Sequence, residues 1–348
     1  MVTNISKIAE FVGQTVTLQG WLYNIRSSGS IAFLEVRDGS GFMQAVVAKD
    51  SVAAEVWENV GKLTQESSLI VTGQVSKHPK KENVYELQVS EVEVLQIAPE
   101  YPIAHKEHGP EFLFDNRDLY LRAKTPWAVL RIRNQVFLSI TNFFHEQGFL
   151  RFDTPILQPT SCEDTTQLFQ LDYYGEPMYL TQSGQLYSEA GIMAFGKVYD
   201  FGPVFRAEKS KTRHHLSELW MMDAEMAFAD QVANMDVQER MVKRIVKDVL
   251  EHCVEELKIL ERDTTILQRL VNEPFVRLKH KEAKAILAAD GITVDPLDGT
   301  KAYGRRQSFL YNRLCVSEFV QFVERLLSII ATDKNRDGFR NNSCQCQH

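Results

Sequence analysis

The chain has 348 residues, of which 44% are hydrophobic and 24% are charged. This length predicts about two domains, and the composition is typical of a soluble globular protein, which argues against a disordered or fibrous one. No apolar run approaches the roughly 20 residues of a membrane span, and the net charge of −7 excludes nonspecific coating of nucleic acid by a basic surface.

The cysteine pattern and the first residues bear on the compartment. The five cysteines are scattered and odd in number, which argues against a disulfide framework. The opening MVTNISKIAE lacks a basic segment followed by an apolar core, so we expect no secretory signal. Both features predict a cytoplasmic protein with no membrane anchor.

The first part of the chain is predicted to be a β-barrel. Five strands rich in Val, Ile and aromatic residues are expected at 15–25, 31–38, 42–48, 68–75 and 85–97. Apolar residues recur at helical spacing in 51–63, between the third and fourth strands. The apolar residues of the last strand change parity near Ser90, which predicts a bulge. This order predicts that residues 1–98 form an OB-fold barrel, although another small barrel or sandwich could have the same number of strands.

Residues 99–118 contain three prolines and no sustained periodicity, which predicts a linker. The second domain, expected over 119–298, begins with an amphipathic helix from Val129 to Phe144 that ends at Gly148. Strands predicted at 178–184, 197–208 and 216–228 bracket a helix at 185–195. This order predicts an α+β domain with an antiparallel sheet. A second long helix follows, with a capping box expected at Asp236 and Glu239.

A basic loop joins two apolar strands of the second domain. The segment FRAEKSKTRHHL places Arg206, Lys209, Lys211 and Arg213 beside Glu208, His214 and His215. A guanidinium group can pair bidentately with phosphate oxygens, and a carboxylate can accept from an amino group. The loop therefore predicts a triphosphate site, although a solvated hairpin tip would have the same composition.

Two segments of this domain resemble the signature motifs of class II aminoacyl-tRNA synthetases. FRAE, RHHL and the returning strand resemble the second motif, and GFLRFDTPILQPTSCED resembles the first, with Pro155 at its proline position. An OB-fold followed by such a core is the arrangement of the aspartate, asparagine and lysine enzymes. The resemblance covers roughly residues 1–298. It implies an anticodon-binding OB-fold barrel, an incomplete class II antiparallel-sheet core, and a homodimer formed through the first motif.

The resemblance also implies the reaction and the ATP site. The enzyme would be a ligase that uses ATP and Mg²⁺ to form an aminoacyl-adenylate before charging tRNA. Arg206 and Glu208 match the catalytic positions, where positioning and charge neutralisation carry the reaction. The positions matched to ATP are Arg206, Glu208, Arg213, His214, His215 and Leu219. His214 stands where a basic residue is usual and could instead contact the acceptor stem, and Leu219 replaces the phenylalanine that usually stacks on adenine. No residue is assigned as a metal ligand.

The stretch TQSGQLYSEA indicates which amino acid the enzyme would activate. It resembles the corresponding stretch of asparagine enzymes. Aspartate enzymes carry a lysine at the position of Ser188, and the ammonium group of that lysine pairs with the substrate carboxylate. A site without that cation favours a neutral carboxamide, so the resemblance implies asparagine and tRNA(Asn) as substrates. Glu163 and Gln185 match further substrate-binding positions, although a turn role for Glu163 and a surface role for Gln185 are open alternatives.

The barrel carries the residues expected to contact tRNA. Phe33 and Gln44 match the family pair that stacks on and reads the central uridine of the anticodon, and Arg26 is expected to assist. Asparagine and aspartate anticodons share this uridine. Alternation alone also permits Phe33 to lie in the core.

The segment 299–348 does not resemble the family. It lacks a third motif with its arginine and a GEIIGGS-like stretch with its magnesium-binding glutamate. We therefore expect a frameshift or premature stop near Gly299 and little or no aminoacylation. A noncatalytic tRNA-binding paralogue and an aspartate-type enzyme are the alternatives. Cys344, Cys346 and His348 have spacing unusual for zinc.

Overall fold

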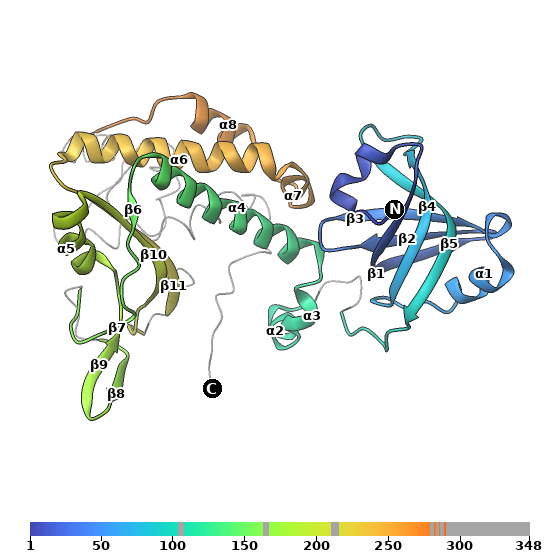
Figure 1. Ribbon diagram of the computed structural model, residues 1–348, viewed down its shortest axis with the longest axis horizontal. Coiled ribbons are helices and arrows are strands. Elements are labelled where there is room, and N and C mark those ends of the chain that lie inside the picture. The colour runs from blue at the N-terminus through green and yellow to red at the C-terminus, as the bar shows by residue number, and fades with distance from the viewer. Residues whose placement is uncertain are drawn as a thin grey trace. The chain divides into compact units, whose positions relative to one another are not determined.

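The computed structural model describes residues 1–103, 108–162, 167–209 and 216–278, together with residues 282, 285 and 289. The chain forms two compact units, residues 1–108 and residues from 109 onward (Figure 1). The predicted tail, 299–348, lies outside the described residues. Among the residues described, no helix is both long and apolar enough to cross a membrane.

The first unit is a closed five-stranded barrel with the strand order β1-β2-β3-β5-β4. Its strands are β1 (Thr15–Ser28), β2 (Ile31–Arg37), β3 (Phe42–Ala48), β4 (Ser68–Lys77) and β5 (Tyr85–Gln96). Strands β3 and β5 pair in parallel, and the other neighbours pair antiparallel. Alternate side chains point inward, so that residues such as Leu18, Leu34 and Leu87 form one apolar core. The predicted strand order and the helix between β3 and β4 are confirmed.

Local irregularities in the barrel follow from single residues. The pairing of β4 with β5 shifts between Thr72 and Gly73 and skips Ser90, so the predicted bulge is confirmed. A Cβ at Gly73 would overlap the backbone of Gln88, so glycine permits the close approach of the two strands. Helix α1 (Ala54–Val60) follows the 3₁₀ turn η2 (Lys49–Ser51), and a further 3₁₀ helix, η1 (Ile5–Phe11), precedes β1.

The segment predicted as a linker, 99–118, contains secondary structure. Helix α2 (Pro110–Asp115) and helix α3 (Arg117–Tyr120) lie at its end, and the two units separate between His108 and Gly109. Pro110 occupies the first turn of α2, where a missing N–H costs nothing. Helices this short contain too few turns to produce a periodic apolar pattern, which is why the sequence did not indicate them.

The second unit is built on two long helices and a three-stranded sheet. Helix α4 (Lys124–Glu146) packs against helix α6 (Gln231–His252), as Figure 1 shows. The sheet has the order β11-β10-β6, formed by β11 (Glu218–Met226), β10 (Lys197–Phe205) and β6 (Leu150–Arg151). Strands β10 and β11 are antiparallel as predicted, whereas β6 joins β10 in parallel.

Alternation along β10 and β11 gives this sheet two different faces. Phe201 and Met222 belong to the core that the sheet shares with α4 and α6. Residues of the other parity, including Asp200, Val204 and Asp223, therefore point to the opposite face. Helix α5 (Gln185–Phe195) packs on β10 and β11.

The remaining elements complete the second unit. A small antiparallel sheet has the order β7-β9-β8, formed by β7 (Leu157–Gln158), β9 (Glu176–Leu180) and β8 (Gln170–Tyr173). The strand predicted at 178–184 ends at Leu180, because the chain then bends into α5. Helix α7 (Val254–Ile259) and helix α8 (Thr265–Asn272) follow α6.

The predicted start of the second long helix is wrong. Helix α6 begins at Gln231, and the carboxylate of Asp230 caps it by accepting from the Ala233 N–H at 2.8 Å. Asp236 and Glu239 lie inside the helix and both accept hydrogen bonds from Arg277. Their spacing matches a capping box, but their carboxylates serve a tertiary contact.

Candidate functional sites

The outer surface of the barrel carries the residues expected to contact tRNA. In β2, Ala32 and Leu34 are buried inside the barrel, whereas Phe33 lies between them with the opposite parity and is partly exposed. The core alternative for Phe33 is therefore wrong. Pairing places Phe33 opposite Arg26 of β1, and Gln44 of β3 opposite Glu86 of β5.

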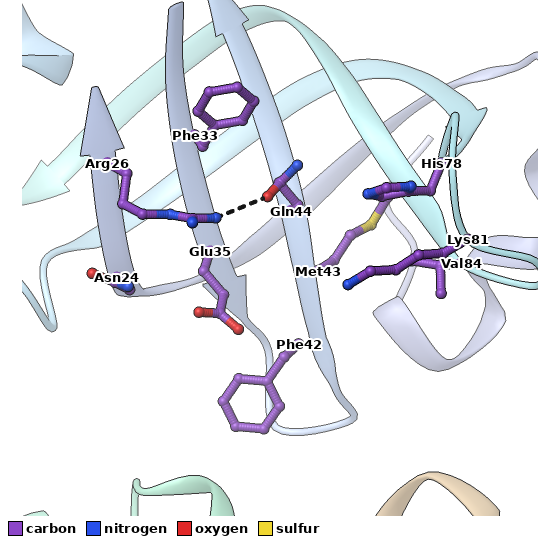
Figure 2. A pocket seen from close by; sticks show the side chains of 10 residues that line it. All are labelled: Asn24, Arg26, Phe33, Glu35, Phe42, Met43, Gln44, His78, Lys81 and Val84. Atoms are coloured by element: carbon purple, nitrogen blue, oxygen red, sulfur yellow. Dashed lines mark hydrogen bonds between the residues drawn. The ribbon is translucent and has the colours of Figure 1, made fainter. Parts of the chain in front are cut away.

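The side chain of Gln44 is held from two sides. Its Oε1 accepts from Arg26 Nη2 at 3.5 Å, which is the dashed line in Figure 2. Its Nε2 donates to Glu86 Oε1 at 2.6 Å. The buried Glu86 carboxylate also lies 3.5 Å from His78 Nε2. A carboxamide has two N–H donors and two acceptor lone pairs, so these contacts orient Gln44 and leave one donor and one acceptor for a ligand.

A cavity of about 260 Å³ lies at this position on the barrel (Figure 2). Its lining residues are Asn24, Arg26, Phe33, Glu35, Phe42, Met43, Gln44, His78, Lys81 and Val84. The cavity therefore combines aromatic rings, cationic side chains and an oriented carboxamide, which suits an unstacked base of single-stranded nucleic acid.

Sequence reasoning missed three residues of this barrel site. Glu86 orients Gln44, and His78 and Lys81 line the cavity from the loop between β4 and β5. Glu86 reads in the sequence as one polar residue of an alternating strand, and its partner Gln44 lies 42 positions away. The lysines and histidine of that loop were the available signal, because cations in a loop beside a binding face attract phosphates.

The second candidate site lies on the sheet face away from α4 and α6. Arg206 follows β10 directly, and its backbone N–H donates to Ser217 O at 2.9 Å, which continues the pairing with the start of β11. Arg206 is partly buried and Glu208 is exposed. Leu219 is 9% exposed and packs with Val204 and Met221 on the same face. The structure thus brings Arg206 and Leu219 to one end of this face.

Four of the predicted site residues lie outside the described part of the chain. These are Glu163 in the segment 163–166 and Arg213, His214 and His215 in the segment 210–215. Their assignment stays a sequence-based prediction. The described ends of the basic loop are Lys209, which follows the end of β10 at Phe205, and Leu216, which precedes the start of β11 at Glu218.

A tight turn before α5 positions the other predicted residues. Asp223 Oδ2 accepts from Ser183 Oγ at 2.8 Å and from the Gly184 N–H at 2.9 Å. The helix begins one residue later at Gln185, which is exposed and donates to Glu189 Oε1 at 2.9 Å. Ser188 lies one turn further along and is completely buried.

The hydroxyl of Ser188 is unusual. Its Oγ is inaccessible to solvent and has no hydrogen-bond partner among the described residues. A buried hydroxyl without a partner carries a desolvation cost of about 1–3 kcal/mol. Because solvent does not reach this oxygen, a ligand could contact it only if neighbouring side chains moved. Ser183 and Asp223, which sequence reasoning missed, hold the turn that precedes it.

Carboxylates give this face a negative character. Burial raises the pKa of Asp200, and the neighbouring charges of Asp223 and Asp153 act in the same direction, while hydrogen bonds from Thr154 oppose them. Burial also raises the pKa of Glu225, together with the charges of Glu189 and Asp223. Carboxylates that lie close together and are partly buried favour a cationic group nearby, such as the ammonium group of an amino acid.

No metal site follows from these carboxylates. Among the described residues, the one close group of ligand-type side chains is Asp248, Glu251 and His252 on α6. Asp248 already accepts two hydrogen bonds from Arg244 Nε. Two of the three side chains are exposed. We assign no role to this group.

Both units match known families. Residues 16–95 match the OB-fold nucleic acid binding domain, and residues 109–342 match tRNA synthetases class II (D, K and N). The second range includes residues 299–342, most of the segment that the sequence alone set apart from the family.

Solved structures of synthetases are similar over most of the chain. Asparaginyl-tRNA synthetase from Pyrococcus horikoshii complexed with asparaginyl-adenylate is 34% identical, with a TM-score of 0.80, covering 89% of this chain and 72% of that chain. Asparaginyl-tRNA synthetase from Entamoeba histolytica in complex with asparaginyl-adenylate is 27% identical, with a TM-score of 0.74, covering 90% and 74%. Aspartyl-tRNA synthetase from Entamoeba histolytica is 26% identical, with a TM-score of 0.70, covering 90% and 69%.

The two units correspond to these two matches. The first is a closed five-stranded barrel, and the second contains the antiparallel strands β10 and β11. The chain therefore belongs to the class II tRNA synthetases of the aspartate, lysine and asparagine group, with an N-terminal OB-fold domain.

Proposed function

We propose that this chain attaches asparagine to tRNA(Asn) through an asparaginyl-adenylate made from asparagine and ATP. The observation that carries the choice of amino acid is Ser188, whose buried hydroxyl stands where aspartate enzymes have a lysine. A serine supplies no positive charge to pair with a substrate carboxylate, which favours a neutral carboxamide. The similarity to two structures that contain asparaginyl-adenylate supports this proposal.

In the proposed reaction, the carboxylate of asparagine attacks the α-phosphorus of ATP and pyrophosphate leaves. Arg206 would neutralise charge on the phosphates, and Glu208 would accept from an amino group of the nucleotide. Leu219 would provide an apolar contact for the adenine, and Arg213, His214 and His215 would complete the ATP site. Mg²⁺, when bound with ATP, would shield the phosphate charge. Gln185 and Glu163 would contact the amino acid.

The barrel would hold the anticodon of tRNA(Asn). Phe33 offers an outward-facing ring for stacking, and the oriented Gln44 offers one donor and one acceptor, which complement the imide edge of uracil. Arg26 lies beside Gln44 and can also contact the base or the backbone. These contacts suit the central uridine, which the asparagine and aspartate anticodons share.

We also propose a homodimer and a cytoplasmic location. Apolar side chains of α4 and the segment after it are at least 36% exposed, namely Leu130, Leu138, Leu150, Ile156 and Leu157. They lie in or beside the first-motif segment, and a second copy could bury them in a twofold interface. Sedimentation of the purified chain would test this, with a dimer expected. The cytoplasm is where charged tRNA meets ribosomes.

The test of the proposed reaction is amino-acid-dependent exchange of pyrophosphate into ATP. We expect exchange with asparagine and none with aspartate at equal concentration. Exchange with aspartate alone would overturn the choice of amino acid and favour an aspartate-type enzyme. Absence of exchange with both, in a folded chain that still binds tRNA(Asn), would favour a noncatalytic tRNA-binding protein.

A further inference from the structure

The turn before α5 leaves no room for a side chain at Gly184. A Cβ built there would overlap Asp200 Oδ2 and lie 2.8 Å from Thr154 Oγ1. The φ of Gly184 is −83°, which any residue can adopt. Space, and not backbone conformation, therefore requires glycine. The turn rests directly on the side chains of Asp200 and Thr154.

Thr154 holds the Asp200 carboxylate in this position. Its hydroxyl donates to Asp200 Oδ2 at 2.7 Å, and its N–H lies 3.4 Å from Asp200 Oδ1. Asp200 is only 7% exposed. Asp200 and Asp223 are directly paired residues on β10 and β11, so their side chains leave the sheet on the same face. Asp223 binds the Ser183 hydroxyl and the Gly184 N–H.

The turn of residues 183–185 is therefore fixed by two carboxylates with different roles. Asp223 holds it by hydrogen bonds to Ser183 and Gly184, whereas Asp200 supports it by contact beneath Gly184. Helix α5 starts at Gln185, and Ser188 follows one turn later. Any displacement of the turn moves both residues together, because they belong to the same rigid first turn of the helix.

We propose that Asp200, locked by Thr154, is a positioning residue that sets the place of Gln185 and Ser188 for amino-acid binding. The inference rests on the proposed function for its kinetic consequences, and its structural part stands independently. Asp200 contacts the turn and not the nucleotide end of the face, where Arg206 and Leu219 lie. Loss of the support should therefore affect the amino acid and leave ATP binding unchanged.

The kinetic test compares Asp200→Ala, Thr154→Val and Asp200→Asn with the wild-type chain in pyrophosphate exchange. We expect Asp200→Ala to raise KM for asparagine about 10- to 100-fold, with KM for ATP unchanged. Thr154→Val should give a smaller increase in the same parameter. Asp200→Asn should restore KM for asparagine, since its carbonyl oxygen can still accept from Thr154. If Asp200→Asn is as impaired as Asp200→Ala, charge and not support is responsible, and the inference is wrong.

A matched control separates positioning from general destabilisation. Asp230→Ala removes the cap of α6 in the same unit and should lower the stability of that unit. It should not change KM for asparagine, because Asp230 contacts Ala233 and not the turn. An equal rise in KM in this control would show that destabilisation alone explains the effect.

Hydrogen exchange of the backbone amides decides the structural part without any catalytic activity. In Asp200→Ala and Thr154→Val, we expect faster exchange in a peptide that covers residues 181–187, with exchange in α4 and α6 unchanged. Unchanged exchange at the turn would overturn the inference. If the wild-type chain exchanges no pyrophosphate with any amino acid, the proposed function fails, and the amide measurement still decides whether Asp200 supports the turn.

Discussion

The barrel and the synthetase unit build their sites in different ways. In the barrel, Arg26, Phe33 and Gln44 come from three neighbouring strands, and antiparallel pairing brings them together. In the second unit, the site combines one sheet face with the start of α5 and a loop. Strand pairing brings together the residues that we propose to contact a base, whereas the proposed amino-acid site depends on packing between different elements. We therefore expect that the two sites can be disabled separately.

The largest effect should come from Arg206. Replacing it with alanine removes the guanidinium group that follows β10 and that we propose to face the phosphates. We expect pyrophosphate exchange to fall about 10²- to 10³-fold. Binding of an anticodon stem-loop RNA should not change. Arg269→Ala, an exposed arginine paired with Glu273 on α8, is the matched control. Loss of RNA binding in Arg206→Ala would show that the two sites are coupled.

Phe33→Ala tests the proposed RNA-binding site on the barrel. Removing the exposed ring should weaken binding of an anticodon stem-loop by about 1–3 kcal/mol, or roughly 5- to 150-fold in Kd. Asparagine-dependent exchange, which needs no tRNA, should be unaffected. Titration with fluorescent stem-loop RNA measures the first quantity. Phe112→Ala, an exposed aromatic residue of α2, is the control, and equal weakening there would contradict a specific role for Phe33.

Asp230→Ala tests whether the units are also independent in stability. Loss of the α6 cap should lower the free energy of unfolding of the second unit by about 1 kcal/mol. We expect the amides of the barrel core, such as those of β2 and β3, to keep their protection in urea. Equal loss of protection in both units would show that they unfold as one.

A smaller effect is expected from pH, and it concerns Asp200. Its raised pKa means that ionisation is less favourable in the folded than in the unfolded chain. The contribution of Asp200 to stability is therefore complete below its unfolded pKa of about 3.9 and is lost as the pH rises through its higher folded value. Asp200→Asn does not titrate, so its stability relative to the wild-type chain should increase as the pH rises above about 4. Urea midpoints at each pH measure this difference, and a constant difference would contradict the raised pKa.

Sequence patterns predicted most of the architecture correctly. The five barrel strands, the bulge at Ser90, the two long helices and the strands on either side of the basic loop were all identified from periodicity and turn residues. These features depend on alternation and spacing along the chain, which are local properties. The start of α6 failed because Asp236 and Glu239 have the spacing of a capping box, while their partner Arg277 lies far along the chain.

Residue type and spacing along the chain define the chemistry that it can carry. The Arg206 motif, the Phe33 and Gln44 pair, and the serine at position 188 can therefore all be recognised from the sequence. Strand register and packing set which way Phe33 points, what orients Gln44, and what supports the turn before α5. The last two depend on Glu86, Asp223 and Asp200, whose partners lie about 40 or more positions away in the sequence. Contacts at such separations arise from strand register and packing, and no local pattern records them.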